Sequence, residues 1–449
     1  MTIDRRTLGL VLAAWCILYG AAALGTGPDE RFETDACGIP PADVPLVAPW
    51  KTITVDAEYG GQWVVVGDVD GDGEVEIVSA RNCNEVDDHY TSSVVVQKLD
   101  GSILWRWGDP QIGRRELHHD VACQIHDLDH NGTNEVIVAG DRQLVVLDGR
   151  SGKPEVVFPI EQYASDCIVF ADLSGQGWPG EILVKTRYGK IWAYAADGRL
   201  LWTVQEPGGY PTSHQPFPVD LDGDGRDEIL AGYAALNSDG SIRWVLEVEK
   251  GHKNGGHADC WRVVRVAQRP EDTRLVMTMC GGEALVMTDG LGQLVWRVSG
   301  CHYESVDVGE IRDDIPGLEL VVDIDHLPAP PMPLCLFSEK GREVGRINTD
   351  YTRHHALVDW NGDGLQEIGS AEPRGLFDGY GRRVCSFAVG EGERPMLFDA
   401  VDLTGCGMRD VMLTTVGQDT YKVYLYRNEI VGSARRDRPA GTGLNYTLY

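Results

Sequence analysis

The chain has 449 residues and a hydrophobic content of 43 %, which is enough for a large buried core. Its formal net charge of −29 excludes the basic surface that nucleic-acid binding requires. No long segment has the apolar period of a helix, so we expect an all-β protein built from short strands.

Residues 1–25 have the pattern of a signal peptide. Arg5 and Arg6 precede an apolar run from Leu8 to Leu24, and small residues follow the run. An uncleaved membrane anchor is the alternative. We therefore expect a secreted or periplasmic protein, with residues 26–49 forming an extended lead-in to the folded domain.

Six loops rich in Asp and Gly follow strand-like segments. Four of them keep oxygen-bearing side chains at loop positions 1, 3, 5 and 9, a spacing that can wrap a calcium ion. The predicted calcium ligands are Asp68, Asp70, Asp72, Glu76, Asp127, Asp129, Asn131, Glu135, Asp220, Asp222, Asp224, Glu228, Asp359, Asn361, Asp363 and Glu367. The loops from Asp172 and Asp402 are weaker copies, in which we expect the turn without the ion. For a single loop the alternative is a solvated turn, because turns favour Asp and Gly.

The loops also mark a repeat. They begin at residues 68, 127, 172, 220, 359 and 402, so most steps are 43 to 59 residues, the range of β-propeller blades. The long step leaves room for two degenerate units, at 260–279 and 305–324. The pattern predicts one domain over residues 50–430, an eight-bladed β-propeller of four-stranded antiparallel blades, with seven blades as the alternative. Residues 431–449 are then a C-terminal tail, and we expect a monomer.

Asp-Gly pairs predict a tight hairpin between the third and fourth strands of most units. These pairs lie at 100–101, 197–198, 239–240, 289–290 and 378–379. The last unit has only three clear strands. We therefore expect residues 50–57 to supply its fourth strand, which would close the ring and remove its open edges.

Ten cysteines remain when Cys16 is removed with the signal segment. An even number in an oxidising compartment predicts some disulfides. Cys123, Cys167 and Cys260 share one position relative to the innermost strands. For these three, a buried free thiol fits the pattern as well as a disulfide does.

Histidines gather just before the innermost strands. Seven of the twelve lie there, namely His118, His119, His214, His257, His302, His354 and His355. In a propeller this connector crosses one face toward the central channel, so these side chains would form a partial ring. Histidine suits acid–base chemistry or metal binding near neutral pH. A repeated structural role for the connector is the alternative.

The second strand of blade 3 ends with Lys185, Arg187 and Tyr188. That strand runs antiparallel to the innermost strand, so its turn returns to the histidine face. The acidic loops lie at the other end of the innermost strands. We therefore expect one site on the histidine face, lined by Arg187, Tyr188, His214, His257 and His302.

Several segments resemble known families. The acidic loops are similar to the calcium loops of FG-GAP and VCBS propeller repeats. Over residues 50–430 the chain resembles secreted polysaccharide lyases of the rhamnogalacturonan, ulvan and rhamnose–glucuronate types. The segments that carry this resemblance are "ILVKTRYGKIWAYAADGRLLW", "SHQPFPVDLDGDGRDEILAGYAALNSDG", "GHADC" and "CHYESVDVG".

The resemblance implies β-elimination at a uronic acid of an acidic polysaccharide. A tyrosine or histidine takes the C5 proton, another group protonates the leaving oxygen, and cations neutralise the carboxylate. Carried onto this chain, it makes Tyr188 and one of His119, His214, His257 and His302 the base and acid, and Lys185 and Arg187 the carboxylate clamps. A non-catalytic carbohydrate-binding or adhesion propeller is the alternative. A hydrolase is disfavoured, because no clear carboxylate pair lies outside the acidic loops.

Overall fold

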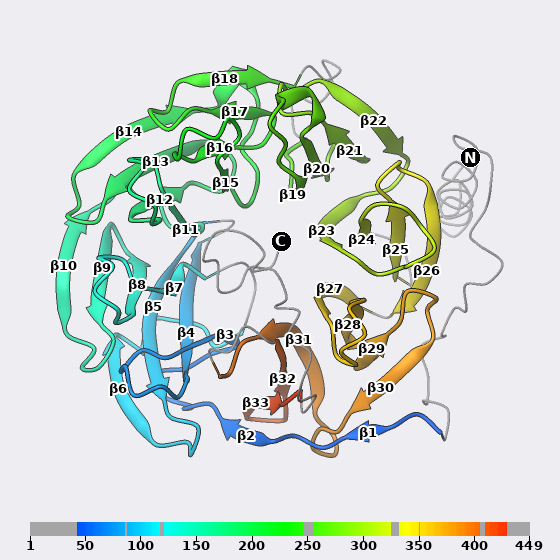
Figure 1. Cartoon of the computed structure of the whole chain (residues 1–449). Helices are drawn as coiled ribbons and strands as arrows, with labels where there is room; N and C mark the ends of the chain where they lie inside the picture. The colour runs from blue at the N-terminus through cyan, green and yellow to red at the C-terminus, as the bar shows by residue number, and fades with distance from the viewer. Residues whose placement is uncertain are drawn as a thin grey trace, which may run out of the picture.

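The computed structural model describes residues 43–85, 88–116, 121–246, 256–324, 332–349, 351–404 and 409–428. These residues form eight antiparallel sheets arranged as a ring (Figure 1). The predicted eight-bladed propeller is thereby confirmed, and the seven-bladed alternative is wrong. In the part of the chain that is described, no helix is long and apolar enough to cross a membrane. The signal-peptide prediction concerns residues outside that part, so the secreted location stays a prediction.

The first four blades follow one another along the chain. Blade 1 consists of β3 (Trp63–Gly67), β4 (Glu76–Glu85), β5 (Asp88–Gln97) and β6 (Ile103–Gly108). Blade 2 consists of β7 (Cys123–His126), β8 (Glu135–Gly140), β9 (Gln143–Asp148) and β10 (Pro154–Pro159). Blade 3 consists of β11 (Ile168–Ala171), β12 (Glu181–Lys185), β13 (Lys190–Ala195) and β14 (Leu200–Gln205). Blade 4 consists of β15 (Phe217–Val219), β16 (Glu228–Leu230), β17 (Ala234–Leu236) and β18 (Ile242–Val245), after the short 3-10 helix η1 (Pro207–Gly209).

The two degenerate units form complete blades. Blade 5 consists of β19 (Trp261–Arg265), β20 (Arg274–Met279), β21 (Ala284–Thr288) and β22 (Leu294–Ser299), with the 3-10 helix η3 (Pro270–Asp272) between its first two strands. Blade 6 consists of β23 (Tyr303–Gly309), β24 (Glu319–Ile324), β25 (Met332–Ser338) and β26 (Glu343–Thr349). Blade 7 consists of β27 (Tyr351–Val358), β28 (Glu367–Glu372), β29 (Gly375–Phe377) and β30 (Arg383–Phe387).

The ring closes as the sequence predicts. Blade 8 consists of β31 (Arg394–Val401), β32 (Asp410–Val416) and β33 (Tyr421–Tyr426), and β2 (Lys51–Thr54) pairs antiparallel with β33 as its outer strand. The end of the predicted lead-in also joins the ring, because β1 (Leu46–Val47) pairs in parallel with β30. This segment therefore runs along the rim and joins blades 7 and 8 (Figure 1).

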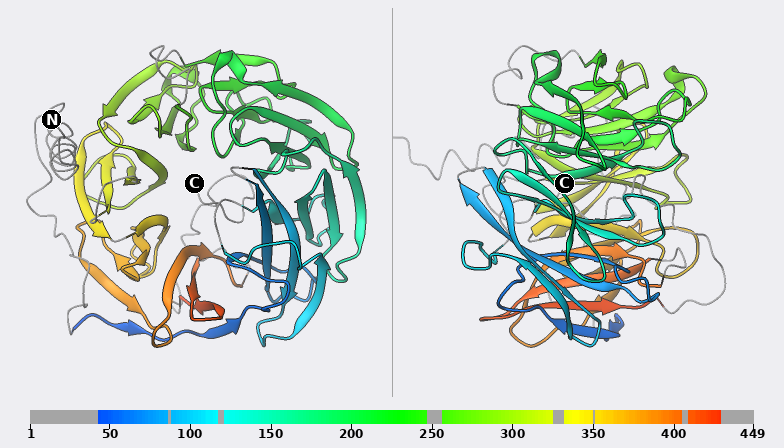
Figure 2. Two further views of the ribbon diagram at one scale, coloured as in Figure 1. Left: turned by 180° about the vertical axis from the view of Figure 1, so that it is seen from behind. Right: turned by 90° about the vertical axis from the view of Figure 1, so that its left-hand side faces the viewer.

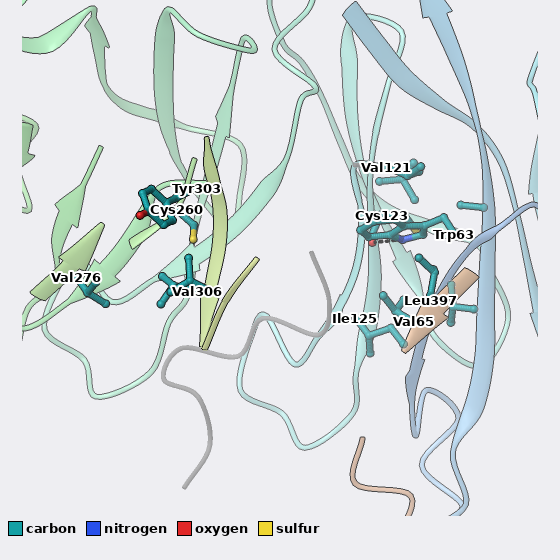
Figure 3. Close-up of a cluster of buried hydrophobic side chains, with 14 of the residues drawn as sticks. Trp63, Val65, Val121, Cys123, Ile125, Cys260, Val276, Tyr303, Val306 and Leu397 are labelled. Atoms are coloured by element: carbon teal, nitrogen blue, oxygen red, sulfur yellow. Dashed lines mark hydrogen bonds between the residues drawn. The ribbon is translucent and has the colours of Figure 1, made fainter. Parts of the chain in front are cut away.

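Apolar residues of the inner strands make the core. Trp63, Val65, Cys123 and Ile125 pack between blades 1 and 2, and the Trp63 indole donates a hydrogen bond to the Cys123 carbonyl at 3.2 Å (Figure 3). The β-branched residues of these strands suit such packing. No disulfide is recorded among the eight cysteines of the described residues, and seven of them are buried. The disulfide prediction is therefore not confirmed among these eight, and the seven buried thiols pack as small apolar groups.

The hairpins between third and fourth strands lie where the Asp-Gly pairs predict them. Gly101 has φ +86°, which the turn between β5 and β6 requires. In blades 5 and 7 the turn has the same length but begins at the aspartate of the pair, so the positive φ of +75° falls on Gly292 and Gly381 instead of Gly290 and Gly379. An Asp-Gly pair therefore locates the turn without fixing which glycine takes the left-handed conformation.

One hairpin is longer than the others. The strands β4 and β5 have 10 residues each, and they project beyond the edge of the disc (Figure 2). The hairpin places His89 against the connector that precedes β11, where its Nε2 lies 3.2 Å from the Asp166 carbonyl oxygen. Blade 1 therefore reaches across blade 2 and contributes to the face of blade 3.

Candidate functional site

Backbone hydrogen bonds tie the β12–β13 turn to the connectors of the next two blades. The Thr212 amide donates to the Tyr188 carbonyl at 2.8 Å, which joins the turn to the connector before β15. The His214 amide donates to the Ala258 carbonyl at 3.2 Å, which joins that connector to the one before β19. Three segments distant in sequence are therefore held as one rigid surface.

Three aromatic side chains meet on this surface. The Tyr188 ring lies 4.3 Å from the His257 ring and 5.2 Å from the His214 ring, measured between centroids. The two imidazole rings lie 4.7 Å apart and are nearly perpendicular. His214 is buried, whereas Tyr188 and His257 are half-buried and reach solvent. The structure thus brings together a phenol and two imidazoles, as the strand directions predict.

A buried carboxylate lies beneath the two histidines. The Oδ1 atom of Asp259 is 3.3 Å from His257 Nε2 and 3.6 Å from His214 Nε2, and Asp259 is fully buried. One ligand atom from each of the three residues lies within 4.8 Å of the other two. Two imidazoles and a carboxylate are a common ligand set for a divalent cation, so these side chains fit a metal ion as well as acid–base chemistry.

The electrostatic environment keeps His257 neutral near neutral pH. Burial lowers the pKa of its imidazole to about 4, and Arg187 and His302 add to the lowering, while Glu304 opposes it. A neutral imidazole can accept a proton or bind a metal. Because His302 and Glu304 of blade 6 affect this pKa, both side chains lie close enough to His257 to interact with it electrostatically.

Two cations of blade 3 share one buried carboxylate. Asp166 receives a hydrogen bond from Lys185 Nζ at 2.7 Å and one from Arg187 Nη1 at 3.4 Å. Burial by itself raises the pKa of Asp166, but the nearby positive charges, that of Lys185 above all, hold it below its usual value. Lys185 is fully buried, so the structure gives it a supporting position instead of direct contact with a substrate carboxylate.

The acidic loops fold around their first aspartate. In the loop after β15, Asp220 accepts hydrogen bonds from the Gly223 and Gly225 amides at 2.7 and 3.0 Å. The degenerate loop at Asp172 is wrapped in the same way, by the Gly175 and Gly177 amides at 2.7 and 2.6 Å. The turn therefore forms even where loop positions 3 and 5 carry Ser174 and Gln176 instead of acids.

The glutamate at loop position 9 also has a structural role. Glu228 accepts a hydrogen bond from the Leu221 amide at 2.9 Å, and burial raises its pKa to about 7. Glu319 of blade 6, whose loop does not keep the spacing of the other acids, accepts amide hydrogen bonds in the same way and has its pKa raised to about 7 by burial. Glu76, Glu135 and Glu367 follow the pattern of Glu228.

Basic side chains enter two of the four loops. Lys98 Nζ lies 2.6 Å from Asp70 and 2.9 Å from Asp72, and Arg243 Nη1 lies 2.9 Å from Asp222 and 3.1 Å from Glu228. Among the described residues, no ion pair with a lysine or arginine is recorded for the loops that begin at Asp127 and Asp359. The four loops are therefore not equivalent as cation sites.

Oxygen atoms in three of the loops are close enough to share one ion. The sets Asp68, Asp70 and Glu76, then Asp127, Asp129 and Glu135, and then Asp220, Asp222 and Glu228 each keep their carboxylate oxygens within 4.8 Å. These oxygen-only sets fit calcium. The loops and the histidines lie at opposite ends of β15, since His214 precedes that strand and Asp220 follows it.

The cluster described around Tyr188 leaves out one predicted site residue and one surface pocket. His119 lies outside the described residues. A surface pocket of about 380 Å³ lies beside the acidic loop of blade 2, lined by Asp129, His130 and Trp178 among others, and it does not include Tyr188 or His257.

Four buried residues of the site were not predicted from the sequence: His89, Asp166, Asp259 and Glu304. A repeated sequence pattern could have identified two of these residues. Asp166 and Asp259 each precede a cysteine, in the segments "SDC" and "ADC", at the same position before an innermost strand. The Asp166 amide donates to the Lys185 carbonyl, and the Asp259 amide donates to the Thr278 carbonyl, so both aspartates meet the end of the second strand of their blade.

Two curated proteins are similar to this chain in sequence, and several solved structures share its fold. No model of a known protein family matches the chain. Two curated proteins of Bacillus subtilis (strain 168) are similar to it: the rhamnogalacturonan exolyase YesX is 24 % identical over 78 % of the chain and 67 % of its own length. The rhamnogalacturonan endolyase YesW is 26 % identical over 77 % of the chain and 64 % of its own length. The chain thus spans about two thirds of these relatives.

Solved structures show the same architecture. The rhamnogalacturonan lyase PL11 of Bacillus licheniformis aligns with a TM-score of 0.60 and 20 % identity, over 86 % of this chain and 75 % of the other. At this identity the likeness establishes the fold. Because one fold hosts many functions, the activity has to be argued from the site.

Proposed function

We propose that this protein is a polysaccharide lyase that cleaves a rhamnose- and uronate-containing polysaccharide by β-elimination. The observation that carries the proposal is the contact of Tyr188 with His257, backed by the Arg187 guanidinium. The similarity to two rhamnogalacturonan lyases supports the choice of substrate class.

The proposed reaction needs two proton transfers. In our proposal the neutral His257 imidazole takes the C5 proton of the uronate, and the Tyr188 phenol gives its proton to the glycosidic oxygen. Breaking the C4–O bond then leaves an unsaturated uronate on one product. The His257 imidazolium then returns the proton to the Tyr188 phenolate. This transfer is short because the two rings are in contact.

The remaining residues stabilise charge. Arg187 places its guanidinium against the phenol oxygen, where it stabilises the phenolate and the uronate carboxylate. A divalent cation held by His214, His257 and Asp259 would neutralise the same carboxylate. Tyr188 would then start as the phenolate that Arg187 stabilises, take the C5 proton and pass it to the glycosidic oxygen. We also propose calcium in the acidic loops, where its role is structural because the loops lie away from Tyr188.

The decisive experiment is incubation with rhamnogalacturonan, with polygalacturonate as a second uronate polymer. Elimination produces a conjugated double bond that absorbs in the ultraviolet, whereas hydrolysis does not. Tyr188→Phe and His257→Gln should abolish the absorbance rise, and Tyr59→Phe, whose ring packs against Arg106 of blade 1, should leave it unchanged. Saturated products would refute the lyase and indicate a hydrolase. Tight binding without any product would support the non-catalytic alternative.

A further inference from the structure

A second cluster of ligand-type side chains lies between blades 5 and 6. Cys280 directly follows β20, the second strand of blade 5, His302 precedes β23, and Glu304 lies within β23. The two strands are neighbours in the ring (Figure 1). The arrangement matches that of Tyr188 and His214, in which a turn after a second strand meets the connector of the next blade.

The three side chains are in mutual reach. Cys280 Sγ lies 3.6 Å from His302 Nδ1, and His302 Nε2 lies 3.6 Å from Glu304 Oε1. One ligand atom from each of the three residues lies within 4.8 Å of the other two. For a tetrahedral ion with bonds of about 2.3 Å to sulfur and about 2.0 Å to nitrogen, the sulfur and nitrogen are about 3.5 Å apart. With Nδ1 as the ligand, the Cys280–His302 separation therefore needs almost no adjustment, while the Glu304 carboxylate, which lies beside Nε2, has to turn toward the ion.

Burial differs across the cluster in a way that suits an ion. Cys280 is buried, and only 4 % of the Glu304 side chain is exposed, whereas 21 % of the His302 side chain is exposed. An ion could therefore enter from the His302 side and keep one position open to water. A thiolate and a carboxylate together supply two negative charges, which balance a divalent cation.

We propose that Cys280, His302 and Glu304 form a binding site for Zn²⁺. The sulfur ligand decides the type of metal, since thiolate and imidazole favour zinc, while oxygen-only loops favour calcium. Three protein ligands with an open fourth position are typical of a zinc ion that binds water or a substrate. This site goes beyond the proposed lyase activity and does not depend on it.

The first test uses the unmodified protein. The chain is stripped with a chelator, reloaded with Zn²⁺ or Co²⁺, and its bound metal is measured by mass spectrometry. We expect one tightly bound zinc per chain and, with Co²⁺, a thiolate charge-transfer band in the near ultraviolet. Zinc should also slow the alkylation of Cys280, measured on its peptide, at least tenfold.

Variants then assign the ligands. Cys280→Ser should remove the cobalt band, and His302→Gln and Glu304→Gln should each weaken zinc binding by about 10-fold or more. Cys83→Ser is the matched control, because Cys83 is half-buried in blade 1 and should leave binding unchanged. Absence of the cobalt band, or an alkylation rate of Cys280 that zinc does not change, would overturn the proposal. These readouts are independent of lyase activity, so either proposal can fail without the other.

Discussion

Arg187 donates a hydrogen bond from its Nε to the phenol oxygen of Tyr188 at 3.0 Å. The other end of the same guanidinium faces Asp166, which also pairs with Lys185. Arg187 thus holds a positive charge beside the phenol, and the ion pair with Asp166 fixes the position of that guanidinium. This relationship gives the site a defined geometry before any ligand binds.

Loss of Arg187 should affect turnover more than substrate binding. In Arg187→Met the phenolate loses its neighbouring charge, so we expect kcat to fall about 100-fold or more, with a smaller change in KM. Tyr188→Phe should lower kcat at least as far. Steady-state kinetics on rhamnogalacturonan measure both, and an Arg187→Met variant that changes KM alone would contradict the role.

Asp166 should be important for stability. Asp166→Asn leaves the fully buried Lys185 ammonium without its carboxylate, which should cost about 3–5 kcal/mol of unfolding free energy. The double variant Asp166→Leu, Lys185→Met should recover most of that loss, because the buried ammonium is removed together with its carboxylate, while Arg187 keeps its hydrogen bond to Tyr188. Urea denaturation measures the difference, and a double variant less stable than Asp166→Asn would contradict this explanation.

The same aspartate predicts a pH dependence. The pKa of Asp166 is lower in the folded state than its usual value, so it contributes stability above that usual value. This contribution should be lost as the pH falls through the acid range toward the lower folded-state pKa. Thermal melts across the acid range should show a smaller slope for the Asp166→Leu, Lys185→Met variant than for the unmodified protein. Equal slopes would show that other groups control acid unfolding.

Calcium should raise the melting temperature, because it would bind the folded loops and not the unfolded chain. Asp129→Ala should reduce this calcium-dependent shift, since Asp129 lies in a loop without a recorded basic partner. Asp141→Ala, an exposed acid outside the loops, is the control. A melting temperature that neither calcium nor a chelator changes would mean that the loops act only as turns.

Lys98 should compete with calcium in the first loop. Its ammonium bridges Asp70 and Asp72, so Lys98→Met should destabilise the protein without calcium and enlarge the shift with calcium. Titration calorimetry can count the sites in both proteins. An unchanged number and affinity of sites would show that Lys98 does not occupy the ion position.

Closure by β2 should be essential for solubility. Removing residues 1–54 would expose the β33 edge of blade 8, and unpaired edges promote aggregation. Removing only residues 1–42 keeps β1 and β2 and serves as the control. Size-exclusion chromatography separates the outcomes, and a soluble monomer without β2 would contradict this role of closure.

The sequence by itself determined the repeat, the number of blades and the strand that closes the ring. These features follow from local patterns, namely alternating apolar residues, turns rich in Asp and Gly, and a regular spacing. It also predicted that Tyr188 meets the connector histidines, because strand direction follows from the order of strands.

Only the tertiary structure decided which charges lie together. Asp166, His89 and Lys185 come from the connector of blade 3, the long hairpin of blade 1 and a second strand, and no sequence spacing relates them. The same holds for Cys280 and Glu304, which belong to different blades. Burial also reversed an expectation, since the resemblance makes Lys185 a clamp for a substrate carboxylate, whereas in the fold it is enclosed and paired with Asp166. Such contacts depend on how neighbouring blades pack, and packing is a property of the whole ring.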